Sequence, residues 1–295
     1  FHQKNMIKVG GITLLSIYTF FLFKNDLQIL FIVLFGSIIM IIGFVSDVTN
    51  KFSPSLRLIL IFLTLVLYLS VSNNYIYSTE IFFVDSLISI NFITLLIFTC
   101  LCLALLINGI NIIDGLHGLS SGFSIICCIS LLSLFFAKDN IVFEFLFAFM
   151  ALLSIFMLIN FFSGRVRLGD SGSYFSGFVL GALSIYIFNT NEINSLKIVC
   201  ILLYPINELV FSYCRRLAAN KNPFDPDQFH LHSLIYLYLI KRWKNKKFDP
   251  EFINRVSSIF LLSYMLLFQL FVFILPEKNM NYTILIAIHI FLYFF

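Results

Sequence analysis

Long hydrophobic runs alternate with short polar stretches along the whole chain. A helix needs about 20 mostly apolar residues to cross a bilayer, and ten runs approach or reach that length. Alternation at period two, which a barrel would need, is absent, so the runs must be helices. The pattern predicts an all-α polytopic transmembrane helix bundle. The expected spans are 9–23, 27–45, 55–71, 91–107, 119–137, 141–162, 170–189, 195–212, 253–275 and 280–295.

Three further expectations concern the organisation of the chain. It opens at Phe1 without Met and ends in an apolar stretch, so we expect a ten-helix fragment of an eleven-helix protein. Residues 1–295 are expected to form a single integral membrane domain. Between 72 and 90, aromatic and β-branched residues follow Asn73 and Asn74, which predicts a short exterior β-hairpin.

Composition supports the membrane class and excludes several others. Of 295 residues, 60% are hydrophobic and 12% are charged, which leaves too few polar residues to cover a soluble globule. The six cysteines lie in or beside spans without metal-ligand spacing, so we interpret them as small apolar residues. No fold for binding nucleic acid accompanies the basic residues, so we expect no nucleic-acid partner.

Basic residues predict the orientation, because cytoplasmic loops carry an excess of Lys and Arg. With a cytoplasmic N-terminal segment, 15 of the 19 Lys and Arg residues are cytoplasmic, nine of them between 213 and 255. We therefore expect a cytoplasmic loop at 213–252. The four basic residues on the other side are Lys24, Lys138, Lys197 and Lys278.

Four polar clusters lie at span ends on that cytoplasmic side, which suggests a single active site. The first is Ser46-Asp47, although Asp47 alone could simply end one helix and cap the next. In the second, Asn108, Asn111 and Asp114 recur every third residue and so bring three oxygen-bearing side chains together on a tight turn. Packing or capping is the alternative, but polar groups beside lipid are costly unless used.

The other two clusters also have two interpretations. Asp170, in Gly169-Asp170-Ser171-Gly172, is either a helix N-cap or part of a site for a hard cation such as Mg²⁺. Arg215 and Arg216 precede a loop that contains His230 and His232. Guanidinium groups bind phosphate and imidazoles bind anions or move protons, whereas the alternative is a solvated basic loop. No third ligand completes a zinc site with this His-x-His pair.

Taken in order, four motifs carry a resemblance to a known family. They are FVSDVTNKFSPSLRL, NGINIIDGLHGL, GDSGS and RRLAANKNPFDPDQFHLH. In this relation to the spans they resemble the polyprenyl-phosphate N-acetylhexosamine-1-phosphate transferases of glycosyltransferase family 4, which include bacterial enzymes that initiate O-antigen and related glycans. The similarity covers nearly the whole chain, and HQKNMIKVGGI is similar to the family's basic segment before its second helix.

The resemblance implies a Mg²⁺-dependent transferase in the bacterial inner membrane, with its active site at the cytoplasmic face. The phosphate of undecaprenyl phosphate would attack the sugar-side phosphorus of a UDP-N-acetylhexosamine and release UMP, as the initiating step of a cell-envelope glycan. Such a transfer depends on alignment and charge neutralisation. The implied partners are undecaprenyl phosphate, a UDP-sugar and the bilayer, with a homo-oligomer left open.

The resemblance also assigns roles to residues of this sequence. The residues expected to take part in the chemistry are Asp47, Asp114, His230 and His232. The expected Mg²⁺ ligands are Asn111 and Asp170. The expected substrate contacts are Asn108, Arg215, Arg216, His117 and Glu208.

Three positions depart from the family pattern. Ser46 stands where the family has the first of two aspartates, His117 replaces the second Asp of the DGxDG motif, and Glu208 replaces an Asp. The missing carboxylate weakens any mechanism that uses it as a base, although a lipid phosphate with a second pKa of about 6 is already largely ionised at neutral pH. A catalytically degenerate homologue that acts as a membrane binding protein is therefore the alternative function.

Overall fold

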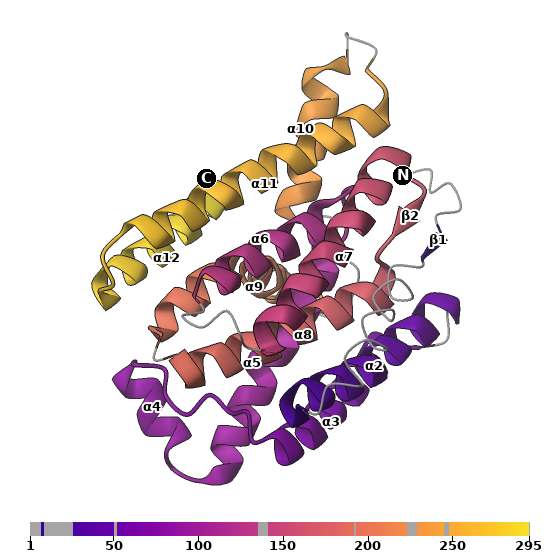
Figure 1. Ribbon diagram of the computed structural model, residues 1–295. Coiled ribbons are helices and arrows are strands. Elements are labelled where there is room, and N and C mark those ends of the chain that lie inside the picture. Colours follow the sequence, from indigo (N-terminus) through magenta and orange to yellow (C-terminus); the bar gives the residue numbers. More distant parts are fainter. Residues whose placement is uncertain are drawn as a thin grey trace.

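Eleven helices make up most of the part of the chain that the structure describes (Figure 1). The structure is a computed structural model, and it describes residues 7–8, 26–49, 52–134, 141–191, 193–222, 229–244 and 248–294. The helices are α2 (Leu27–Val48), α3 (Pro54–Ser72), α4 (Phe82–Ile88), α5 (Phe92–Ile112), α6 (Leu119–Ser133), α7 (Ile141–Ser163), α8 (Gly169–Asn191), α9 (Ser195–Ala218), α10 (Leu231–Arg242), α11 (Pro250–Ile274) and α12 (Asn279–Phe294).

The helices confirm the predicted all-α polytopic membrane bundle. Among the described residues, seven helices are long and apolar enough to cross a membrane, namely α2, α3, α5, α7, α8, α9 and α11, and the shorter apolar helices are α6 and α12. Each expected span from 27–45 onward coincides with one of these nine helices. The expected span 9–23 lies outside the described residues.

Two short strands accompany the helices. β1 (Ile7–Lys8) pairs in parallel with β2 (Val166–Arg167), so the described part of HQKNMIKVGGI lies beside the segment that leads into α8. The segment 213–252, expected as one loop, contains the end of α9, the helix α10 and the start of α11. Residues 223–228 and 245–247 of that segment are outside the described part of the chain.

The hairpin prediction between 72 and 90 is wrong. Residues 73–81 contain no strand, and α4 follows them. Side chains from neighbouring helices take the backbone groups that a hairpin would pair: Thr99 accepts from the Ile76 N–H, and Asn189 donates to the Tyr75 carbonyl. The carboxylate of Asp85 accepts from the Thr79 N–H at 2.6 Å, which closes the segment into a turn.

Helix α8 lies between α2 and α5 and is almost completely buried. Glycines let the three backbones approach closely, as is common where membrane helices pack. A Cβ on Gly43 of α2 would lie 2.6 Å from the backbone oxygen of Asp170, and one on Gly177 of α8 would lie 2.7 Å from the Cα of Ile107 in α5. The start of α8 is therefore held against the end of α2.

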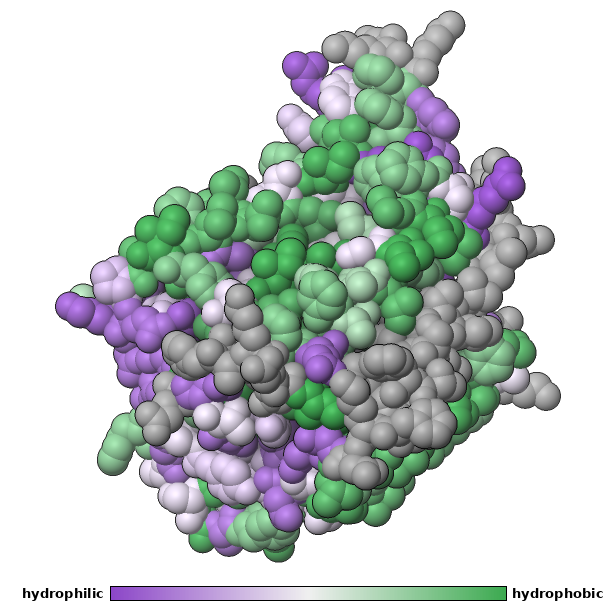
Figure 2. All heavy atoms as spheres, viewed as in Figure 1, coloured by the Kyte–Doolittle hydropathy of each residue, from purple (hydrophilic) through white to green (hydrophobic). Residues whose placement is uncertain are grey.

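The bundle has two ends, here called the α10 end and the α4 end after the helices that lie there (Figure 1). On the face shown in Figure 2, hydrophobic residues cover α11 and its neighbours between these ends, while hydrophilic residues gather at the ends themselves. The exposed side chains of α11 include Leu267 and Phe271, which are 57% and 56% exposed. This hydrophobic surface between the two ends fits contact with lipid acyl chains. At the α4 end, Asn74 donates to the carbonyl of Ala182 in α8.

Candidate active site

The end of α2 meets the start of α8 through Asp47. Its two carboxylate oxygens accept hydrogen bonds from the backbone N–H groups of Asp170 and Ser171, both at 3.1 Å. These N–H groups belong to the first turn of α8, where no partner within the helix is available. Asp47 and Asp170, expected at one site from their positions at span ends, are therefore neighbours.

The carboxylate of Asp170 joins four helices. Its Oδ2 accepts from Ser46 Oγ of α2 at 2.8 Å and from Arg57 Nη1 of α3 at 2.5 Å. Its Oδ1 accepts from Asn111 Nδ2 of α5 at 2.9 Å, and the same amide donates to Ser173 Oγ. The Asp170 and Arg57 side chains are 21% and 23% exposed, so this ion pair is only partly screened by water.

Asp114 lies just beyond α5 and also contacts the start of α8. Its Oδ2 accepts from the Gly169 N–H at 3.1 Å, and Arg167 donates to the backbone carbonyls of Asp114 and Gly115. Burial raises the pKa of Asp114 to about 7, and the positive charge of Arg167 opposes that rise. Its carboxyl group thus changes charge close to neutral pH.

The two expected imidazoles lie together at the start of α10. The rings of His230 and His232 are stacked with an interplanar angle of 3°. Their Nδ1 atoms lie 3.3 Å and 3.7 Å from the carboxylate oxygens of Glu208, a fully buried residue of α9. The Nε2 of His232 lies 2.3 Å from the place a Cβ on Gly115 would take, so His232 reaches the turn that contains Asp114.

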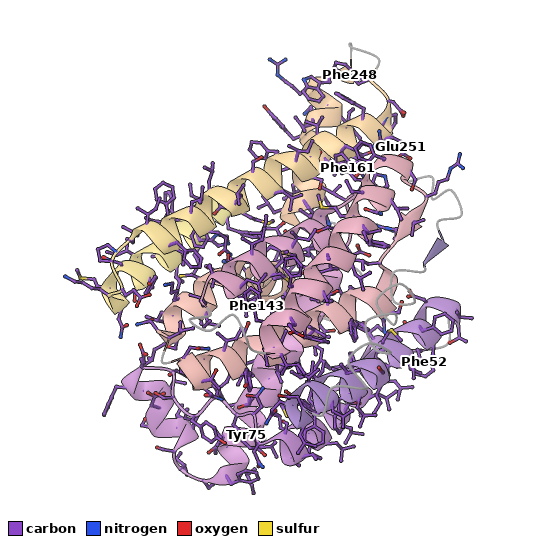
Figure 3. The ribbon with its side chains drawn as sticks, viewed as in Figure 1. Phe52, Tyr75, Phe143, Phe161, Phe248 and Glu251 are labelled. Carbon is purple, nitrogen blue, oxygen red and sulfur yellow. The ribbon has the colours of Figure 1, made fainter. Side chains whose placement is uncertain are left out.

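Other expected site residues have different neighbours. Asn108 donates to the Ala104 carbonyl of its own helix. His117 Nε2 is 2.9 Å from Glu251 Oε2 of α11, and its backbone N–H donates to Asn254. Figure 3 labels Glu251 near Phe161, on the side of α11 that faces α7. Burial lowers the pKa of His117, although the Glu251 carboxylate acts in the opposite direction.

The two arginines of the fourth motif lie in the last turn of α9. Both are partly exposed, and the guanidinium carbon of Arg215 is 5.9 Å from the centroid of the Phe229 ring. Arg216 accepts through its backbone carbonyl from the N–H of Lys221, which helps to end the helix. The arginines therefore flank the segment that leads to the histidines.

Arg57 was missed as a site residue by the sequence reasoning. It appeared there only as a basic residue that supports the orientation, because a Lys or Arg near a span end is common. The available signal was its place in FVSDVTNKFSPSLRL, ten residues after Asp47 and near the start of an apolar helix. Ser46 is a second neighbour of Asp170 whose contact was not predicted.

The oxygen atoms of Asp170 and its neighbour Asn111 are of the type that binds a hard cation. Among the described residues, no group of three or more His, Cys, Asp or Glu side chains is arranged to hold a metal ion. Mg²⁺, however, is usually bound by one or two carboxylates together with phosphate oxygens and water. Asp170 supplies a carboxylate, and the neighbouring Asn111 supplies an amide that carries an oxygen. These two residues are the ones that could hold Mg²⁺ beside a substrate phosphate.

Comparison with known proteins places this geometry in a family. The model of glycosyl transferase family 4 matches residues 29–188, which include Asp47, Asn111, Asp114 and Asp170. The undecaprenyl-phosphate alpha-N-acetylglucosaminyl 1-phosphate transferase of Thermotoga maritima is 31% identical over 166 residues, 56% of this chain and 47% of that protein. The decaprenyl-phosphate N-acetylglucosaminephosphotransferase of Mycobacterium leprae is 29% identical over 152 residues, 43% and 37% of the two chains.

The matched part spans less than half the length of these two relatives. The family match itself covers more than half of this chain, from early α2 to late α8. The chain therefore belongs to glycosyl transferase family 4.

Proposed function

We propose that the protein transfers N-acetylhexosamine-1-phosphate from a UDP-sugar to undecaprenyl phosphate and releases UMP, as the initiating step of a bacterial cell-envelope glycan. The observation that carries the proposal is the convergence on one carboxylate, that of Asp170, of side chains from α2, α3 and α5. The names of the two relatives support transfer of a sugar phosphate to a polyprenyl phosphate.

In the proposed reaction, an oxygen of the lipid phosphate attacks the sugar-side phosphorus of the UDP-sugar. The bond from that phosphorus to the bridging oxygen breaks, and UMP leaves with the electron pair. Because little covalent chemistry is required of the protein, its residues act by holding phosphates in line and offsetting their charge. Bound Mg²⁺, held by Asp170 and Asn111, would neutralise charge on the diphosphate.

Asp47 has a positioning role in this proposal. Both of its oxygens accept N–H groups of α8, so the carboxylate fixes the backbone that carries Asp170. A lipid phosphate is largely ionised at neutral pH and needs no general base. Ser46, in place of the family's first aspartate, is compatible with catalysis because it donates to Asp170 instead of repelling it.

The Arg167 guanidinium and the His232 imidazole would face the phosphates. Arg167 lies beside the Asp114–Gly115 turn, and the His232 imidazole reaches the same turn. Positive groups already in place as charge develops stabilise a transition state without reorganisation of solvent. Basic residues are concentrated near this end of the bundle, and we therefore propose that the site opens to the cytoplasm across the inner membrane.

A panel of UDP-sugars tests the proposal. The full chain in lipid nanodiscs would receive undecaprenyl phosphate, Mg²⁺ and each UDP-sugar in turn, and UMP and lipid-linked product would be measured. We expect equal amounts of both with at least one UDP-N-acetylhexosamine, and neither when the lipid phosphate is omitted. Absence of UMP with every UDP-N-acetylhexosamine would overturn the assignment.

One observation favours the alternative of a binding protein without turnover. Arg57 and Ser46 both engage Asp170 Oδ2, the atom that a metal ion would need. A degenerate homologue would bind UDP-sugar, as measured by calorimetry, with no release of UMP. Binding accompanied by turnover excludes this alternative.

A further inference from the structure

The carboxylate of Glu208 is the centre of a hydrogen-bonded network that three helices share. Glu208 lies in α9 and is 0% exposed. Its Oε1 accepts from the Tyr204 hydroxyl at 3.0 Å, and its Oε2 accepts from the Tyr293 hydroxyl of α12 at 2.8 Å. On the α10 side, His230 Nδ1 lies 3.3 Å from Oε2. A carboxylate buried among membrane helices is costly unless donors surround it, and such residues are commonly functional.

The same carboxylate lies beside the Nδ1 edges of both imidazoles and is within hydrogen-bond distance of His230. Both Nδ1 atoms face Glu208, so the opposite edges, which carry Nε2, face away from it. The Nε2 of His232 lies against the backbone of Gly115, next to Asp114. A carboxylate that accepts from one nitrogen of an imidazole fixes the tautomer and direction of the ring. Glu208 thereby orients His230. The Nδ1 of His232, 3.7 Å from Oε1, has no hydrogen-bond partner among the described residues, and this ring is placed by its stacking on His230.

Tyr293 contacts both Phe211 and Glu208 of α9. Its ring stacks on Phe211 of α9, with centroids 4.6 Å apart and an interplanar angle of 16°. Its hydroxyl donates to Oε2, the same atom that His230 approaches. Loss of this donor would remove the shortest contact of Oε2 and leave the longer ones, from the Leu231 N–H at 3.4 Å and His230 Nδ1 at 3.3 Å, and we expect the carboxylate to shift toward its remaining donors.

We propose that Tyr293 is a positioning residue of the transferase: its hydroxyl fixes Glu208, Glu208 orients the His230 imidazole, and the stacked His230 ring holds His232 against the Asp114–Gly115 turn. The inference rests on the proposed function. It makes α12 part of the active-site support, although this helix lies outside residues 29–188, where the family model matches.

A matched control exists on the same helix. Tyr282 of α12 is 0% exposed, and its hydroxyl has no hydrogen-bond partner. Tyr282→Phe and Tyr293→Phe therefore remove the same atom from two tyrosines of one helix, and only Tyr293 touches Glu208. Any general effect of such a change on α12 will occur in both variants.

The first measurement is steady-state kinetics of the full chain in nanodiscs. For Tyr293→Phe we expect kcat to fall at least about tenfold, with the KM for the UDP-sugar within about twofold of the wild type, as for lost transition-state stabilisation. For Tyr282→Phe we expect both constants within about twofold. If Tyr293→Phe matches the wild type, or if both variants lose kcat equally, the proposal is overturned.

The second measurement does not need turnover. The chain has five histidines, so ¹⁵N-histidine NMR gives few signals, and single-site variants assign those of His230 and His232. Tyr293→Phe should shift these two signals, and Tyr282→Phe should not. Unshifted signals in Tyr293→Phe would contradict the positioning role. A wild-type protein without turnover would instead overturn the proposed function, while the spectra would still decide whether Tyr293 controls the histidines.

Discussion

His232 lies directly against Gly115, with its Nε2 only 2.3 Å from the position that a Cβ on that glycine would occupy. This contact joins α10 to the turn after α5, and it connects two motifs 117 positions apart in the chain. The absence of a side chain at residue 115 is therefore a requirement of the site.

Gly115→Ala should displace the imidazole of His232 and lower turnover at least about tenfold, because a positioned charge-stabilising donor commonly contributes that much or more. UMP release measures the effect. Gly36→Ala in α2 is the control, since the three atoms nearest its new Cβ are ring atoms of Phe175 and Phe178, at 2.9 to 3.3 Å, and the close contact is thus with apolar rings. Normal turnover in Gly115→Ala would mean that His232 does not act at this turn.

Asp170→Asn should abolish transfer while the protein stays folded. The amide keeps the size of the side chain and one of the two acceptor oxygens, to which either Ser46 or Asn111 can donate, but it loses the charge that would hold Mg²⁺. Turnover and the thermal unfolding midpoint in detergent would be measured together, with Ser176→Ala as the control, because the Ser176 hydroxyl donates to the Gly172 carbonyl of the same helix. Activity within about threefold of the wild type would refute the assignment of Asp170 to the metal.

Arg57→Gln should strengthen binding of a divalent cation in the absence of substrate. The guanidinium competes for Asp170 Oδ2, and a partly buried ion pair contributes on the order of 1 kcal/mol, which corresponds to roughly fivefold in affinity. Electron paramagnetic resonance of Mn²⁺ reports free cation directly. The control is Arg255→Gln, because Arg255 donates to the Phe162 carbonyl. Equal or weaker Mn²⁺ binding by Arg57→Gln would show that the arginine does not compete.

The low pKa of His117 should make the folded protein less stable at acid pH. Burial lowers its pKa in the folded protein, so the unfolded chain takes up the proton more readily. Its contribution to stability is complete above the ordinary histidine pKa of about 6.5 and is lost as the pH falls through the lowered value. His117→Gln keeps an N–H donor for Glu251. Below the ordinary histidine pKa, the unfolding midpoint of this variant should depend less on pH than that of the wild type. An unchanged pH dependence would assign the acid sensitivity to another group.

The membrane helices were predictable because their lengths follow from bilayer thickness alone. The meeting of Asp47, Asn111 and Asp170 was also predictable, since all three lie at span ends on one side of a bundle. The hairpin prediction failed because Thr99 and Asn189, which take the backbone groups of residues 75 and 76, are distant in sequence.

The directions of side chains at turns could not be predicted from the sequence. Gly118 adopts a φ of 75°, and the chain turns there into α6. His117 consequently meets Glu251 of α11, 134 positions away, although its place in the motif suggested a substrate contact. Arg57 donates to Asp170, which lies 113 positions away in the chain. The sequence of an apolar helix contains no periodic pattern that would predict such a pair.

The fate of the sugar-side phosphate tests the central claim most directly. A UDP-N-acetylhexosamine labelled with ³²P at that phosphate would be incubated with the full chain, undecaprenyl phosphate and Mg²⁺, and lipid and nucleotide would then be separated. Transfer of sugar-1-phosphate predicts the label in the lipid fraction and unlabelled UMP in the aqueous fraction. Label that stays on the nucleotide as UDP while sugar enters the lipid, or no labelled lipid at all, would contradict the account.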